Sequence, residues 1–144
     1  MKSLIITLML TFTMISASYS AGNPKATLEI KQNTVSSLMK GLSSENLGLK
    51  SSSAYMLGEL KVTSAVIPLM KILRCNENED LRIVAALALY KIGTPLSINA
   101  VKQSVRFDNS TRVSKLCASF YNEYLKNKYD EEEKYQYAVN TDEK

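Results

Sequence analysis

The sequence contains no histidine and no tryptophan, and among its 144 residues it has five glycines, three prolines and two cysteines. Without histidine, the chain lacks the side chain that most often serves as a general base near neutral pH and as a zinc ligand. The scarcity of glycine and proline argues against a turn-rich β-sandwich and favours helices. No glycine-rich phosphate loop and no distinctive carboxylate pair stands out. These absences predict an all-α protein that is not an enzyme and needs neither a cofactor nor a metal.

The two cysteines, Cys75 and Cys117, are predicted to stay apart. Cys117 falls where a repeating pattern places small inward-facing residues, whereas Cys75 follows the end of a predicted helix. A disulfide requires both side chains to point toward one another at close range. Two separate structural thiols are therefore expected, with a disulfide as the alternative that an oxidising compartment would allow.

The first twenty residues have the pattern of a secretory signal peptide. Lys2 supplies a positive charge, residues 4–15 are mostly apolar, and residues 16–21 are small apart from Tyr19. Cleavage after Ser20 fits best, and the apolar run is shorter than the roughly 20 residues that span a bilayer. We expect export to the periplasm or the cell exterior with no membrane span after cleavage, and the alternative is an uncleaved anchor.

A 32-residue internal repeat dominates the rest of the chain. Such periodicity marks units that are too small to bury an apolar face alone and that stack on one another. The related positions are Leu49, Leu81 and Val113; Ala54, Ala86 and Ala118; Leu57, Leu89 and Tyr121; and Leu60, Ile92 and Tyr124.

Within each unit the apolar residues follow the spacing of one helix face, and Gly93, Thr94 and Pro95 form a helix end followed by a helix start. Pro68 lies several residues past the preceding turn, so a separate short turn is expected before its helix. The helices should stack as antiparallel pairs in a right-handed α-solenoid, about six helices within residues 21–128. The predicted pieces are a lone helix at 26–42, helical hairpins at 45–74 and 79–106, and a closing helix at 110–128.

This pattern resembles the bacterial HEAT-like repeat, in particular the short form of phycobilisome-lyase-type proteins. Residues 61–63 depart from the Gly-Asp-Pro turn of that pattern, and the third unit stops after one helix. The matching positions in the later unit are Leu81, Arg82, Ala86, Leu89, Ile92, Gly93, Pro95, Ile98, Val101 and Val105; those in the earlier unit are Leu49, Lys50, Ala54, Leu57, Gly58, Leu60, Ala65, Val66, Leu69 and Leu73.

Charge divides the chain into a basic domain and an acidic tail. Residues 21–129 hold 15 Lys and Arg against 8 Asp and Glu, whereas residues 130–144 hold 2 against 6. The tail, residues 129–144, has too little apolar content to offset its ordering entropy, and it is predicted to be a frayed extension of the closing helix that becomes disordered.

The resemblance implies that the second helix of each hairpin lines a concave surface, where basic residues could bind an acidic partner. The alternative reading is that cations simply favour helix C-termini, at Arg74 and Arg106 above all. The candidate partner-binding residues are Lys40, Lys71, Arg74, Lys102 and Arg106.

The resemblance implies a non-catalytic adaptor that binds a protein or peptide, possibly acidic, on the concave face, and the signal-peptide pattern predicts that this adaptor is exported. The alternative is an accessory or lyase-like subunit acting on a cofactor-bearing protein, as some relatives of the repeat do. A basic solenoid could also bind nucleic acid inside a cell, but the predicted export argues against a nucleic-acid partner.

Overall fold

A computed structural model describes residues 24–142 of the chain, and the side chains of residues 32–134. The predicted signal peptide lies outside the described residues. The chain divides into two units, one up to Thr34 and one from Val35 onward, and the second unit contains the repeats.

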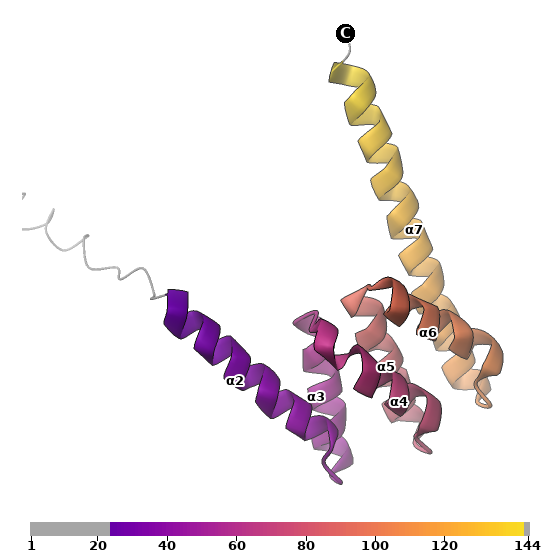
Figure 1. Cartoon of the computed structure of the whole chain (residues 1–144). Helices are drawn as coiled ribbons and strands as arrows, with labels where there is room; N and C mark the ends of the chain where they lie inside the picture. Colours follow the sequence, from indigo (N-terminus) through magenta and orange to yellow (C-terminus); the bar gives the residue numbers. More distant parts are fainter. Residues whose placement is uncertain (1–23, 143–144) are drawn as a thin grey trace, which may run out of the picture. The chain divides into compact units, whose positions relative to one another are not determined.

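The described residues form α-helices and one short 3₁₀ turn, with no strand among them (Figure 1). The predicted all-α fold is thereby confirmed. None of the described helices is both long and apolar enough to cross a membrane. The elements are α2 (Pro24–Leu42), α3 (Leu47–Glu59), η2 (Thr63–Ala65), α4 (Val66–Cys75), α5 (Glu79–Ile92), α6 (Pro95–Phe107) and α7 (Thr111–Asp142).

The helices of the second unit stack in two layers, as an α-solenoid does. Helix α5 packs against α3 on one side and α7 on the other, which makes a first-helix layer of α3, α5 and α7. Helices α4 and α6 contact each other and cover α5, and α6 also contacts α7. We call α4 and α6 the second-helix layer; Figure 1 shows them nearer to the viewer than α5.

The turns that enter the first helices repeat at the same 32-residue interval. In each turn, one side chain accepts a hydrogen bond from the backbone N–H of the residue two positions later, which tightens the chain before the helix. That later residue caps the helix, because its own side chain accepts a hydrogen bond from the backbone N–H three positions further along. The turn acceptors are Ser44, Asn76 and Asp108, and the caps are Asn46, Asn78 and Ser110.

The ends of the first helices also correspond. Gly93 follows α5 in the left-handed conformation with φ of 70°, and Thr94 caps α6, which begins with Pro95, as predicted. Lys61, 32 residues before Gly93, takes a φ of 50° although it carries a side chain. The turn expected before Pro68 is η2, which ends just before α4 begins.

Leucines and alanines fill the space between the layers. Leu57, Leu69 and Leu89 are fully buried, and the alanines beside them allow close helix approach. Helices α3 and α5 approach closely at Gly58, where an added Cβ would lie 2.6 Å from the Cα of Ala88. The absence of a side chain at Gly58 therefore sets the spacing of α3 and α5.

Helix α7 includes most of the C-terminal tail. It continues to Asp142, so residues 129–142 are helical. No glycine or proline occurs after Pro95 to end a helix, and Lys128 pairs with Glu132 one turn on, at 3.7 Å. The tail is thus an extension of the closing helix.

Candidate functional site

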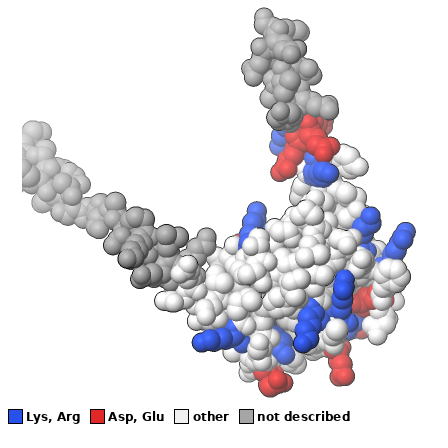
Figure 2. Space-filling view, in the orientation of Figure 1, with Lys and Arg blue, Asp and Glu red and all other residues white. Residues whose placement is uncertain are grey.

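The five basic residues predicted from the sequence are all exposed, and four of them lie on the second-helix layer. Neither α4 nor α6 contains an acidic residue. In Figure 2 this side of the molecule carries blue Lys and Arg side chains, with red ones mainly near its lower edge and on α7. We call this set the basic face: Lys40, Lys71, Arg74, Lys102 and Arg106.

The cations of the basic face and those of the first-helix layer differ in their partners. Lys91 pairs with Glu59, and Arg112 pairs with Asp80 at 2.6 Å, each across 32 residues from one first helix to the next. Within the part of the chain that the structure describes, no residue of the basic face makes an ion pair. An anion from a partner would therefore meet cations with no carboxylate already bound.

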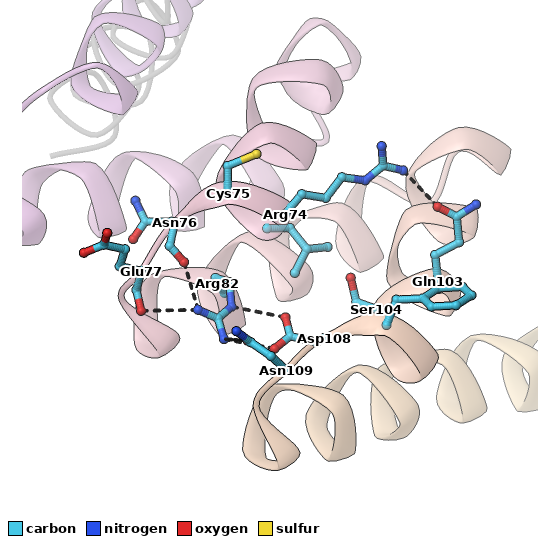
Figure 3. A pocket seen from close by; sticks show the side chains of 11 residues that line it. Arg74, Cys75, Asn76, Glu77, Arg82, Gln103, Ser104, Asp108 and Asn109 are labelled. Atoms are coloured by element: carbon cyan, nitrogen blue, oxygen red, sulfur yellow. Dashed lines mark hydrogen bonds and ion pairs between the residues drawn. The ribbon is translucent and has the colours of Figure 1, made fainter.

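A groove of about 600 Å³ lies between the C-terminal ends of α4 and α6. Arg74 of α4 donates from Nη2 to Oε1 of Gln103 on α6 at 2.9 Å, so its guanidinium is held at the groove (Figure 3). Phe107 lines the same groove, and its side chain is 81% exposed. The groove thus offers one oriented cation beside one large apolar surface.

A buried ion pair forms the base of this α4–α6 groove. Arg82 binds both carboxylate oxygens of Asp108, at 2.9 and 3.1 Å, and both side chains are less than a tenth exposed. The same guanidinium donates to the backbone carbonyls of Asn76 and Glu77 and to Oδ1 of Asn109 (Figure 3). These bonds join the turn before α5 to the turn after α6, so the pair has a structural role.

A second groove, of about 450 Å³, lies between the end of α2 and α4. Lys71 and Lys50 line it together with apolar side chains such as Met39 and Leu42. Cys75 and Asn76 line both this α2–α4 groove and the α4–α6 groove, so the two adjoin. Their combined length follows the direction in which the repeats stack.

The structure does not bring all five predicted residues to the grooves. Lys71 and Arg74 line them, whereas Lys40 and Arg106 line neither. Lys102 points toward α7, with its Nζ 5.6 Å from the ring centroid of Tyr121. The charge pattern identified the residues of the basic face, and the packing of the helices decided which of them line the grooves.

Sequence reasoning missed Lys50, Gln103 and Phe107 as groove residues. Gln103 could have been found, because it lies 32 residues after Lys71 and so occupies the same repeat position. Phe107 likewise corresponds to Cys75, and both are exposed at the end of a second helix. The repeat register was therefore a usable signal for groove residues, in addition to charge.

Another cavity lies on the first-helix layer, near the ends of α3 and α5, and the Lys91–Glu59 ion pair lines it. Its lining includes Glu59, Lys91 and Tyr90. The hydrogen bond from Lys91 lowers the pKa of Glu59, and the same bond raises the pKa of Lys91. Burial raises the pKa of Tyr90, and the nearby Glu123 carboxylate raises it further. Glu123 and Glu131 also line this cavity, which makes it a weaker candidate for anion binding than the basic face.

The cysteines and carboxylates form no metal site in the described part of the chain, where no group of three potential ligands occurs. Cys75 is exposed and Cys117 is buried, and both are free thiols, as predicted. Burial, together with the nearby Asp108 carboxylate, raises the pKa of Cys117 to about 12. Cys117 is therefore an unreactive packing residue at neutral pH.

Comparison with known proteins supports the repeat assignment. A family model described as HEAT repeats matches residues 35–119. No curated protein sequence matches the chain. Among solved structures, that of human deoxyhypusine hydroxylase in complex with glycerol is similar to this chain, with 28% sequence identity and a TM-score of 0.57. The similarity covers 62% of this chain and 31% of the hydroxylase chain. This chain therefore spans less than a third of the hydroxylase chain.

Proposed function

The chain belongs to the HEAT repeat family, and from that premise we propose that it is an exported, non-catalytic scaffold that binds an acidic segment of a protein along its basic face. The observation that carries the proposal is the pair of adjoining grooves lined by Lys71 and Arg74. Stacked repeats commonly use such extended surfaces to bind partners.

The chemistry of the grooves suits a peptide that alternates carboxylates with apolar side chains. Arg74 can form a bidentate pair with a carboxylate, and its bond to Gln103 reduces the entropy lost when it binds. Phe107 and Met39 offer apolar contacts in the two grooves. Neither α4 nor α6 has a carboxylate, and the carboxylates that line the α4–α6 groove are Asp108, which Arg82 binds, and Glu77 in the turn after α4.

The non-catalytic part of the proposal rests on the side chains available. The chain has no histidine, and its buried cysteine has a raised pKa. The hydroxylase resemblance supplies no activity here, because the shared part is less than a third of that enzyme.

Binding to a defined acidic probe tests the proposal. The probe is a fluorescent peptide of alternating glutamate and leucine, measured by anisotropy at low and at physiological salt. Lys71→Glu/Arg74→Glu should weaken binding at least tenfold. The matched control, Lys115→Glu/Lys126→Glu on the exposed surface of α7, makes the same charge change and should alter binding less than twofold. Equal losses in the two variants would contradict the proposal, because net charge alone would then explain binding.

Export is tested separately. The sequence of residues 1–144 is expressed in a bacterium, and the intact mass of the protein from the periplasm and the medium is measured. Cleavage after Ser20 is the expected result. A full-length product confined to the cytoplasm would contradict export while leaving peptide binding to be judged by its own assay.

A further inference from the structure

The C-terminal part of α7 carries four consecutive carboxylates, and all four side chains are exposed. Figure 2 shows them as a red group on the part of α7 that extends past the repeats. We call these residues the acidic segment: Asp130, Glu131, Glu132 and Glu133.

Two members of the acidic segment have no partner of opposite charge. Glu132 pairs with Lys128 at 3.7 Å, and Glu131 lines the cavity on the first-helix layer. Asp130 and Glu133 make no ion pair within the residues whose side chains are described. These two carboxylates are therefore open to a cation from outside the helix.

The two carboxylates match the cations of the grooves in their spacing. Asp130 and Glu133 are three residues apart on α7. Lys71 and Arg74, which line the α2–α4 and α4–α6 grooves, are three residues apart on α4. Helix residues with this spacing are surface neighbours, with about 5–6 Å between their Cβ atoms. Two helices lying side by side can thus pair both carboxylates with both cations.

A copy cannot bring the acidic segment to its own α4–α6 groove while α7 is helical. Asn109 lines that groove, and α7 begins two residues later at Thr111. Because a helix rises about 1.5 Å per residue, Asp130 lies about 28 Å along α7 from that end. Figure 1 shows the later part of α7 projecting beyond α5 and α6. The segment is therefore placed to reach the grooves of another copy.

We propose that the acidic segment of one copy binds the grooves of a second copy, with its two unpaired carboxylates facing Lys71 and Arg74. This inference rests on the proposed function, because it identifies the tail of the chain itself as one acidic ligand of the basic face. When each copy gives its segment to the other, the two contacts are equivalent and the assembly closes as a pair. An acidic protein partner then has to displace the segment, so self-association limits partner binding at high protein concentration.

Reversing the charges on each side of the contact tests the proposal. The face variant is Lys71→Glu/Arg74→Glu, and the tail variant is Asp130→Lys/Glu133→Lys. Sedimentation equilibrium at low salt measures the association of protein expressed from residues 1–144, from micromolar to submillimolar concentration. The unchanged protein should self-associate. Each variant alone should show a dissociation constant raised at least tenfold, because like charges then meet across the contact.

An equimolar mixture of the two variants should associate again. Its dissociation constant should lie within threefold of that of the unchanged protein, because both contacts between unlike copies then join opposite charges. This result requires contact between copies. A segment that folded back on its own copy would leave the mixture unassociated.

A control variant separates the contact from net charge. Glu45→Lys/Glu79→Lys makes the same charge change as the tail variant, at two exposed carboxylates outside the tail. It should leave the dissociation constant within threefold of the unchanged protein. Circular dichroism establishes that every variant is folded.

Three outcomes would overturn the proposal: an unchanged protein that is monomeric throughout the range, a tail variant that associates as the unchanged protein does, or a mixture that stays monomeric. The glutamate–leucine peptide is also measured on the tail variant, which keeps the grooves. Peptide binding there, without self-association of the unchanged protein, would overturn this inference alone. Absence of both would overturn the proposed function as well.

Discussion

Two successive repeats of this protein have the same fold and are stabilised differently. Repeat one comprises α3, η2 and α4, and repeat two comprises α5 and α6. Repeat two has a buried Arg82–Asp108 pair, whereas the corresponding positions in repeat one are Lys50 and Asn76. Repeat two also lies between first helices on both sides, whereas α3 is covered by a first helix on one side alone in the described structure. The shared pattern therefore specifies the fold, and the helices next to each repeat determine which of its residues are buried.

The buried ion pair should give the largest difference between the repeats. Arg82→Ala leaves the Asp108 carboxylate buried without its cation, and we expect a loss of about 3–5 kcal/mol in the free energy of unfolding. Lys50→Ala, at the same position in repeat one, should change it by less than about 1 kcal/mol because that half-exposed residue makes no described ion pair. Urea denaturation measures both, and equal losses would show that the repeats do not differ in this respect.

The boundary between the repeats should be the next most sensitive place. Gly58→Ala puts a Cβ against the backbone of Ala88, which must move, and we expect a loss of about 1–3 kcal/mol in the free energy of unfolding. Gly48→Ala, in the exposed first turn of the same helix, meets nothing closer than Asn46 Oδ1 at 3.3 Å. It should be neutral or stabilising by up to about 1 kcal/mol. Thermal unfolding of the two variants compares them, and a neutral Gly58→Ala would contradict the close approach.

The residue that follows the first helix has a left-handed backbone in both repeats, so opposite substitutions at these two positions can be compared. Lys61→Gly relieves a left-handed conformation in repeat one and should raise the free energy of unfolding by up to about 1 kcal/mol. Gly93→Ala introduces the same strain in repeat two and should lower it by about 1 kcal/mol. Opposite signs in urea denaturation are the expected result, and a loss in both variants would refute the equivalence of the two positions.

The smallest effect concerns reactivity. At pH 8 a thiol reagent should label Cys75 of repeat one and spare Cys117, whose pKa burial raises to about 12. One thiol per folded chain should react, and two in denaturant. Cys75→Ser should reduce the folded count to zero; any remaining fast labelling would show that Cys117 is accessible.

Much of the fold was predictable from the sequence because its signals are local. The 32-residue register, the cap formed by Thr94 and the left-handed Gly93 depend on residues a few positions apart. The helical course of the tail as far as Asp142 was harder to predict, because its low apolar content and the lack of a helix-breaking residue after the start of α7 point in opposite directions.

The candidate site was predictable in part. The absence of acidic residues from α4 and α6 is visible in the sequence and indicated the basic face. The bond from Arg74 to Gln103 and the pair between Arg82 and Asp108 join residues 29 and 26 positions apart, so neither follows from local spacing. Packing alone selected which cations line the grooves.

By itself, the sequence determined the repeating unit, the helix boundaries within it and the sign of the charge on the second helices. These features follow from the periodicity, capping and composition of nearby residues. The tertiary structure determined which residues of the repeated pattern are buried. Leu49 and Leu81 occupy the same position in successive repeats, yet one is exposed and the other buried. The physical reason is that burial depends on the helix that packs alongside, and that neighbour is brought there by the fold rather than by the adjacent residues.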